Sequence, residues 1–265
     1  MRAAARPARP RRSAFWRGVR VSLVSAAFVC AAVAAAGYFD SDAVHVYPAV
    51  PPMRDVAVVN VSGDMGLRFL LGASTSRGLT EHHIGVVGIS SPVYFRRRRT
   101  RAEVDAFVAD AVRTALARTG ARRLVVMGQS YGADIVQTGM AHLPAELRAR
   151  VVGIILVLPG DAVFYRADPT GWAYHGTPDS VGVTTARTLT WTPLTCIYGA
   201  EEDDSLCPLL DLPNARKIAM PGGHNINHDA ERLLRHVLAA VGRAEAAAVS
   251  VLRSFPASSG GRPKA

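Results

Sequence analysis

The amino-acid sequence predicts an α/β fold with a mostly parallel sheet and helices on both of its faces. Three observations support this prediction. Short apolar segments rich in β-branched residues alternate with longer segments of helical periodicity. One apolar segment runs directly into a Gly-x-Ser-x-Gly turn that is followed by a helical pattern. The composition, 49% hydrophobic and 20% charged over 265 residues, is that of a globular protein with a sizeable core.

Six segments are predicted to be strands buried on both faces, because each is short and almost uniformly apolar. They are residues 56–61, 83–89, 124–127, 151–158, 194–198 and 217–220. The clearest helix is predicted at residues 101–118, where apolar residues recur at intervals of three and four. Strands that alternate with helices favour parallel pairing, because a parallel neighbour is reached only through a crossover connection.

The N-terminal part of the chain has the pattern of an export signal. Residues 1–20 contain seven arginines and no acidic residue, and the next 19 residues, 21–39, carry no charge. Segment 21–39 is interpreted either as a signal peptide, with a cleavage site at Ala34-Ala35-Ala36, or as a membrane anchor, because 19 residues can just span about 30 Å of hydrocarbon. In both cases we expect the rest of the chain to be periplasmic.

The remaining charge is small and shows no nucleic-acid-binding character. The formal charge of +10 comes from 31 basic and 21 acidic residues, and without the seven N-terminal arginines 24 basic residues face 21 acidic ones. A nucleic-acid-binding domain would instead concentrate its basic residues on the folded part. We expect a proline-containing linker at residues 40–54, a single domain at 55–257 and a disordered tail at 258–265.

Residues 124–134 place Ser130 in a sharp turn between a strand and a helix. In this segment, Leu-Val-Val-Met-Gly-Gln-Ser-Tyr-Gly-Ala-Asp, Ser130 stands between Gly128 and Gly132. Glycine is needed on both sides because the turn leaves no room for Cβ atoms, and the turn raises the serine above the edge of the sheet. This is the nucleophile position of the α/β-hydrolase fold, with at most a small cap expected here.

A serine nucleophile needs a general base, and the base needs an orienting carboxylate; in this fold the order along the chain is Ser, acid, His. His224 follows Pro221-Gly222-Gly223 directly after the last predicted strand. A neutral imidazole there can take the proton of Ser130 near pH 7. We therefore expect His224 to be the base.

The orienting acid is expected in the acidic run that follows the strand at 194–198. Asp204 is favoured, because Asp204 to Pro208 has the D-x-x-x-P spacing often seen where an acid loop turns into a helix. Asp203 is the second candidate, and Glu202 is a weaker one. Asp161, which follows another predicted strand, is a further alternative.

Two backbone amides are expected to bind the oxyanion of the tetrahedral intermediate. One is the N–H of Tyr131, the residue after the nucleophile. The second belongs to the glycine-containing loop at residues 62–66 after the first strand, where we assign it to Asp64 and keep Met65 as the alternative. No metal ion and no organic cofactor are expected, because this chemistry requires neither.

Cys196 and Cys207 bracket the acidic run with ten residues between them. In an exported protein they are expected to be oxidised to each other. Such a disulfide contributes about 2–3 kcal/mol on the chain-entropy account, and it would fix the acid loop relative to His224.

Between about residue 56 and residue 237, the chain resembles the family of the bacterial virulence protein VirJ and the homologous domain of AcvB. The most specific match is residues 196–208, Cys-Ile-Tyr-Gly-Ala-Glu-Glu-Asp-Asp-Ser-Leu-Cys-Pro, and residues 128–134, 221–224 and 62–64 match as well. The chain departs from the family pattern at Met65, Leu67 and Ser90. Because of the departures at Met65 and Leu67, the oxyanion loop and the adjacent pocket wall can differ in shape from those of the family.

The resemblance implies a periplasmic serine esterase, with hydrolysis of aminoacylated phosphatidylglycerol, such as lysyl-phosphatidylglycerol, as its reaction and type IV secretion proteins as possible partners. The alternative function is a hydrolase-fold binding protein that assists secretion or envelope assembly. Two further groups bear on a lipid substrate. Arg96 to Arg99 with Arg101 can hold anionic head groups at a membrane surface, or can be a solvated basic loop. A small cap over the pocket is expected between residues 159 and 190, with four aromatic residues as contacts or as packing: Phe164, Tyr165, Trp172 and Tyr174.

Overall fold

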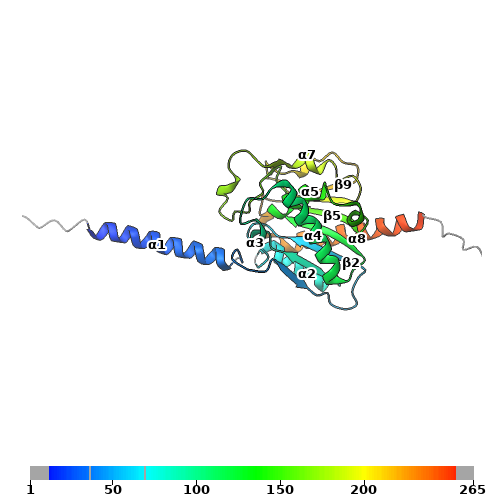
Figure 1. The fold of residues 1–265 in the computed structure, drawn as a ribbon, viewed down its shortest axis with the longest axis horizontal. Coiled ribbons are helices and arrows are strands. Elements are labelled where there is room, and N and C mark those ends of the chain that lie inside the picture. The colour runs from blue at the N-terminus through cyan, green and yellow to red at the C-terminus, as the bar shows by residue number, and fades with distance from the viewer. Residues whose placement is uncertain (1–11, 36, 69, 255–265) are drawn as a thin grey trace, which may run out of the picture.

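The computed structural model describes residues 12–35, 37–68 and 70–254, and its main body is a seven-stranded sheet between two layers of helices (Figure 1). The strand order is β1-β3-β2-β4-β5-β8-β9, and all neighbours are parallel except β1 and β3. The strands are β1 (Val44–Tyr47), β2 (Val56–Val61), β3 (Val86–Ile89), β4 (Arg123–Gln129), β5 (Val151–Val157), β8 (Leu194–Gly199) and β9 (Ala215–Met220). This is the α/β-hydrolase fold that the sequence predicts.

Four longer helices cover the sheet. Helices α4 (Arg101–Thr119) and α5 (Tyr131–Met140) lie on one face, and α2 (Leu70–Glu81) and α8 (Ala230–Ser254) lie on the other. The remaining elements are short: α3 (Ser91–Phe95), α6 (Ala145–Arg148), β6 (Ala162–Val163), η1 (Trp172–Tyr174), β7 (Ser180–Val181), α7 (Gly182–Ala186), η2 (Cys207–Leu209) and η3 (Ile226–His228).

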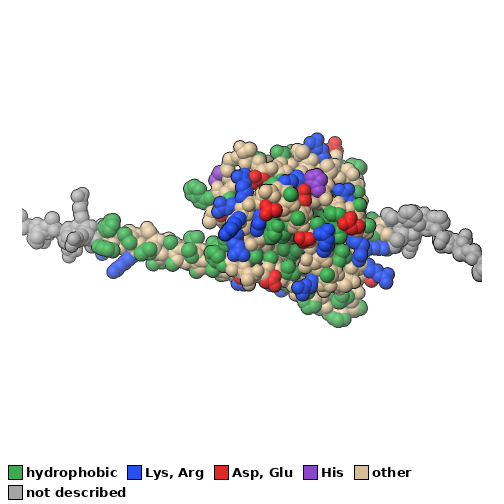
Figure 2. All heavy atoms as spheres, in the orientation of Figure 1, with side chains coloured by type: hydrophobic (Ala, Val, Ile, Leu, Met, Phe, Trp, Pro, Cys, Tyr) green, Lys and Arg blue, Asp and Glu red, His purple; other side chains and the backbone are tan. Residues whose placement is uncertain are grey.

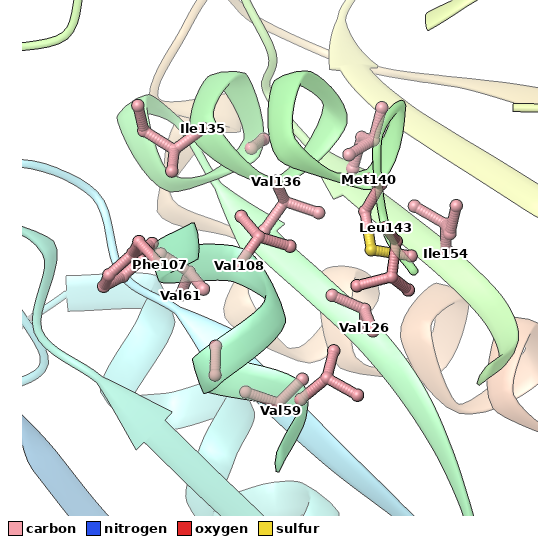
Figure 3. Packing of buried hydrophobic residues seen from close by; sticks show 14 of the residues in the cluster. Val59, Val61, Phe107, Val108, Val126, Ile135, Val136, Met140, Leu143 and Ile154 are labelled. Atoms are coloured by element: carbon pink, nitrogen blue, oxygen red, sulfur yellow. The ribbon is translucent and has the colours of Figure 1, made fainter. Parts of the chain in front are cut away.

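Each strand divides its side chains between two cores. In β4, Val126 packs under α4 and α5, whereas Val125 packs against the α2 and α8 side. Figure 3 shows Val108 of α4 beside Val136 of α5, in the same cluster as Val126 of the sheet. The alternation follows from the two-residue period of a strand, and it explains why these strands are apolar at almost every position.

The structure confirms the six predicted strands, which all lie in the main sheet, and adds one strand to that sheet. Residues 44–47, expected as part of a linker, form β1 and pair with Val86–Ile89 at the edge of the sheet. The segment Val-His-Val-Tyr is suited to a strand, but at four residues beside three prolines it was too short to stand out. Residues 83–85, expected at the start of a strand, precede β3 instead, and His83 has a positive φ of 67°.

Helix α1 (Arg12–Ala35) stands apart from the sheet domain (Figure 1). Its segment from Phe15 to Ala35 is long and apolar enough to cross a membrane, and none of that window is buried in the protein. A signal peptide passes the same test, so both interpretations of segment 21–39 stand. The tail predicted at 258–265 and the first 11 residues lie outside the described part of the chain.

Candidate active site

Ser130 occupies the turn between β4 and α5 in a strained backbone conformation, with φ 50° and ψ −125°. A Cβ atom on Gly128 would lie 2.3 Å from the carbonyl oxygen of Gly132, and one on Gly132 would lie 2.2 Å from that of Val61. Both distances are far below van der Waals contact, so the turn closes only with glycine at both positions. The turn is the nucleophile elbow of the α/β-hydrolase fold.

Ser130 and His224 are directly hydrogen-bonded. The Oγ of Ser130 donates to Nε2 of His224 at 2.7 Å. The other ring nitrogen, Nδ1, donates to Oε1 of Glu202. The second carboxylate oxygen of Glu202 accepts from the N–H of Gly199 at 3.2 Å. The three side chains therefore form a chain of hydrogen bonds of the Ser-His-acid type.

The electrostatic environment favours the protonated form of His224. The hydrogen bond to Glu202 raises the pKa of the imidazole above its usual 6.5, and this effect exceeds the opposing one of burial. The charges of Glu202, Asp204 and Asp64 add to the increase. The surroundings of His224 are thus suited to a general base, because they stabilise the imidazolium that a base becomes when it takes a proton.

The partner of His224 is Glu202, and the expectation that Asp204 or Asp203 would take this place is not met. Residues 204–206 run beside residues 159–161: the N–H of Asp161 donates to the carbonyl of Asp204 at 3.0 Å, and that of Leu206 donates to Pro159 at 2.9 Å. This pairing places the Asp204 side chain in the wall of the pocket, without a hydrogen bond to His224.

The other two acid candidates have different surroundings. Asp203 is exposed and does not line the pocket. The Oδ1 of Asp161 accepts from the N–H of Val183 at 2.7 Å, so this carboxylate holds the start of α7.

Gly199, at the end of β8, brings together two loops: the acid loop, residues 200–206, and the histidine loop, residues 221–225. A Cβ atom on Gly199 would lie 2.2 Å from the carbonyl oxygen of Gly223. The turn that follows closes through the N–H of Glu202, which donates to the carbonyl of Gly199 at 3.1 Å. Glu202 thus lies in the tight turn that directly follows β8, and no local pattern in the sequence distinguished it from the acids that come after it.

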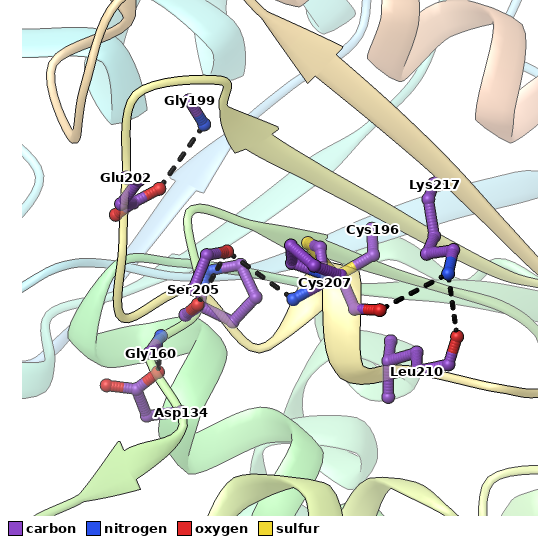
Figure 4. The surroundings of a disulfide bond; sticks show 11 residues. Asp134, Gly160, Cys196, Gly199, Glu202, Ser205, Cys207, Leu210 and Lys217 are labelled. Atoms are coloured by element: carbon purple, nitrogen blue, oxygen red, sulfur yellow. Dashed lines mark hydrogen bonds between the residues drawn. A yellow bond between two sulfur atoms is a disulfide. The ribbon is translucent and has the colours of Figure 1, made fainter.

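Cys196 and Cys207 form the predicted disulfide, with their Cα atoms 5.5 Å apart (Figure 4). Both residues are fully buried, and the bond joins β8 to η2 at the far end of the acid loop. Figure 4 shows Glu202 on the same loop, hydrogen-bonded to Gly199. The loop that carries Glu202 is therefore held at one end by the hydrogen bond to Gly199 and at the other end by the disulfide.

The backbone amides of Tyr131 and Asp64 are available beside Ser130. Neither has a hydrogen-bond acceptor within the described part of the chain. The loop at residues 62–66 approaches Ser130 closely, because a Cβ on Gly63 would lie 3.5 Å from that of Ser130. The amide of Met65 donates to the Asp64 carboxylate, which also accepts from the hydroxyl of Tyr174 at 2.9 Å. The Asp64 side chain therefore braces the loop, and the geometry favours the Asp64 amide over the alternative of Met65.

A pocket of about 420 Å³ opens above Ser130, and its wall is acidic. Four carboxylates line it, those of Asp64, Asp134, Glu202 and Asp204. No Lys or Arg is among the described residues that line the pocket. Burial raises the pKa of Asp64, and it raises that of Asp134 well above the usual range, with the neighbouring carboxylates adding to the effect. Asp134, to which the sequence assigned no role, accepts from the N–H of Gly160 at 2.8 Å.

The predicted arginine cluster is largely engaged within the protein. Arg98 pairs with Asp179, Arg99 with Glu103 and Arg101 with Asp105. Arg96 donates to backbone carbonyls, including that of Asp40. In the described structure, Arg97 is the member of the cluster that has no such partner. Most of the cluster therefore connects elements of the protein.

The predicted cap is a segment of 16 residues between β6 and β7, residues 164–179. Phe164 and Tyr174 line the pocket, and Tyr165 is buried. Trp172 is exposed and takes no part in the pocket wall. Among the described residues there is no group of three or more His, Cys, Asp or Glu side chains arranged to hold a metal ion.

Solved structures share the fold at low sequence identity. A proline iminopeptidase from Mycobacterium smegmatis has a TM-score of 0.56 and 13% identity, covering 77% of this chain and 95% of its own. Est1E from Butyrivibrio proteoclasticus has a TM-score of 0.54 and 13% identity, covering 77% and 96%. MenH from S. aureus has a TM-score of 0.53 and 10% identity, covering 77% and 99%. These likenesses show the α/β-hydrolase fold.

A search of curated proteins gave no significant match. At the level of families, residues 55–245 match "Bacterial virulence protein (VirJ)". The match covers more than half of the chain, and it contains Ser130, the acid loop with its disulfide, and His224. This chain therefore belongs to the VirJ family of bacterial virulence proteins.

Proposed function

We propose that this protein is an exported serine esterase in which Ser130, His224 and Glu202 form the catalytic triad. The observation that carries the proposal is the hydrogen-bond chain from Ser130 through His224 to Glu202, at the mouth of a pocket. The Oγ of Ser130 attacks the ester carbonyl while its proton passes to His224. The bond between the acyl carbon and the alcohol oxygen breaks, and His224 gives the proton to the departing alcohol.

The acyl group is then on Ser130 and is released by water. His224 takes a proton from a water molecule, which attacks the acyl carbon, and the proton returns to Oγ as the free acid leaves. In both steps the negative oxygen of the tetrahedral intermediate is bound by the amides of Tyr131 and Asp64.

We further propose that the substrate is the aminoacyl ester of an aminoacylated phosphatidylglycerol, such as lysyl-phosphatidylglycerol. The acidic pocket supports this choice, because its carboxylates would attract the ammonium group of an aminoacyl ester and disfavour an anionic acyl group. The raised pKa of Asp134 is consistent with a carboxylate that lacks a cationic partner in the free protein. Membership of the VirJ family and the apolar N-terminal helix agree with a lipid substrate.

Covalent labelling tests the nucleophile. A fluorophosphonate should label the purified protein at Ser130, and Ser130→Ala should abolish both labelling and hydrolysis of short-chain esters. An unlabelled wild-type protein without esterase activity would favour the alternative, a hydrolase-fold binding protein that assists type IV secretion or envelope assembly.

Lipid analysis tests the substrate. Deletion of the gene should raise the fraction of aminoacylated phosphatidylglycerol, and Ser130→Ala should fail to restore it. The purified protein should release free amino acid from this lipid. Unchanged lipid profiles, in cells that make the aminoacylated lipid, would exclude the substrate and leave the esterase activity standing.

The variant Asp134→Asn tests recognition of the ammonium group. The ratio of kcat/KM for a cationic aminoacyl ester to that for a neutral ester of equal length should fall by about tenfold or more, because a bound ammonium group would lower the raised pKa of Asp134 and form an ion pair with its carboxylate, which Asn cannot form. The matched control is Asp203→Asn, which removes a charge from the exposed part of the acid loop. Equal ratios in both variants would contradict this role of Asp134.

A further inference from the structure

The arginine run after α3 connects three segments that are distant in the sequence. Arg96 donates to the carbonyl of Asp40, in the connection that follows α1, at 2.9 Å. Arg98 pairs with Asp179 of the cap at 2.6 Å, and the N–H of Arg99 donates to the carbonyl of Tyr165 at 2.9 Å. The α3–α4 loop therefore contacts both the connection after α1 and the cap, and the three segments are neighbours on one surface of the protein.

This surface adjoins the catalytic pocket. Tyr174 of the cap lines the pocket and donates to Asp64 across it. On the other side, Arg68 follows the pocket wall at residues 63–66 and pairs with the Asp40 carboxylate at 2.7 Å. The cap, through Tyr174, and the connection after α1, through the Arg68–Asp40 pair, are thus both held beside the pocket.

The groups exposed on this surface are of the kinds found at the boundary of a membrane. Trp172 is 81% exposed, the highest value for a large hydrophobic side chain in the described part of the chain, and Phe39 is 63% exposed. The ring of Trp172 contacts that of His175 only edge-on. Arg97 is exposed and has no acidic partner among the described residues. Trp favours the interfacial zone of a bilayer, and Arg favours anionic head groups.

Helix α1 limits how far this surface can lie from a bilayer. The part of α1 that is long and apolar enough to cross a membrane ends at Ala35, and Asp40 is held on the domain by Arg68 and Arg96. Five residues span at most about 18 Å, so a membrane-embedded α1 keeps the surface near the head groups. Figure 1 shows the cap segment, in yellow-green, on the side of the domain where α1 joins it, and Figure 2 shows Lys and Arg side chains at this junction.

We propose that Phe39, Arg97 and Trp172 form a membrane-docking rim, and that the cap inserts Trp172 into the interfacial zone of the lipid bilayer. Docking in this way would place the pocket, which Tyr174 of the same segment lines, against the lipid surface. The inference concerns the orientation of the domain on the membrane, and it does not depend on which ester is hydrolysed.

Quenching of tryptophan fluorescence tests the rim. The chain has three Trp residues, and Trp16→Phe removes the one in α1, so that Trp172 and Trp191 remain. This variant, as the full chain in proteoliposomes of phosphatidylcholine and phosphatidylglycerol, should be quenched when the lipids are brominated near the head group. The double variant Trp16→Phe/Trp172→Phe should lose most of the quenching, because Trp191 packs under Arg148 and its ring nitrogen is buried.

These fluorescence measurements distinguish a lipid bilayer from a second copy of the chain on the rim, and they do not depend on enzyme activity. Trp172 is exposed, so its replacement should leave the fold intact, and an unchanged far-UV circular dichroism spectrum checks this. Equal quenching in the two variants, or none in either, would overturn the proposal. A blue-shifted Trp172 that bromine does not quench, and that depends on protein concentration, would place a second copy of the chain on the rim instead.

Discussion

Glu202 and Asp204 are two positions apart on one loop, yet their carboxylates have different surroundings. The Glu202 side chain is only 5% exposed and is hydrogen-bonded to both His224 and the N–H of Gly199. Asp204 is exposed and lines the pocket. A carboxylate that orients a histidine must itself be held, and of the two only Glu202 has side-chain hydrogen bonds that hold it within the described structure.

We therefore predict that Glu202→Gln lowers kcat for a neutral ester by about 10³ to 10⁴, because the amide would hold the imidazole in the wrong tautomer. Asp204→Asn should have a far smaller effect on the same ester. Steady-state kinetics of the two purified variants decides between them. The reverse ranking would return the acid role to Asp204.

The pH dependence of the reaction follows from the state of His224. The base must be neutral, so activity should rise with pH as the imidazole loses its proton. Because Glu202 raises this pKa, the acid limb of kcat/KM for a neutral ester should lie above pH 6.5. In Glu202→Gln the limb should move to lower pH, since the hydrogen bond to a charged acceptor is lost. An acid limb below pH 6.5 in the wild-type protein would contradict this arrangement.

At the scale of elements, the acid loop is defined by its two ends. At one end, Gly199 lets β8 approach the histidine loop, and at the other the disulfide attaches η2 to β8. Between them, the pairing of residues 204–206 with residues 159–161 ties the loop to the chain after β5. The loop is thereby an ordered part of the site.

Removal of the disulfide should weaken the domain as a whole. We predict that Cys196→Ala/Cys207→Ala lowers the free energy of unfolding by about 2–3 kcal/mol, because the unfolded chain gains the freedom of the opened loop. Urea denaturation of the variant and the wild-type protein measures the difference. Cys30→Ala, which removes the exposed free cysteine, is the control and should leave the value unchanged. Equal stabilities of the double variant and the wild-type protein would contradict the prediction.

At the scale of the whole molecule, the arginine-rich start, the apolar α1 and the buried disulfide all agree with export. Basic residues tend to remain on the cytoplasmic side of an inserted segment, so we expect the sheet domain on the other side of the membrane. The disulfide would form there, in an oxidising compartment.

We predict that alkaline phosphatase fused after residue 254 is active in bacteria, because this enzyme matures only in the periplasm. A green fluorescent protein fused at the same place and exported through the same pathway should be dark. A fluorescent fusion together with an inactive phosphatase would place the domain in the cytoplasm and contradict the topology.

The sequence by itself determined the fold, the sharp turn that carries Ser130 and the disulfide pair, and it selected the histidine that contacts Ser130. Each of these depends on local chemistry. Strands buried on both faces are apolar at almost every position, and the turn around Ser130 admits only glycine at Gly128 and Gly132. Cys196 and Cys207 have only ten residues between them, so each is the other's nearest cysteine in the sequence.

Tertiary structure decided which acid meets His224 and that Asp134 lies in the pocket. It also decided that arginines of the predicted cluster join the α3–α4 loop to the segment after α1 and to the cap. These outcomes depend on the direction in which a side chain leaves an irregular loop. That direction is set by backbone pairing with distant segments, such as residues 159–161 beside the acid loop, and no local pattern in the sequence encodes it.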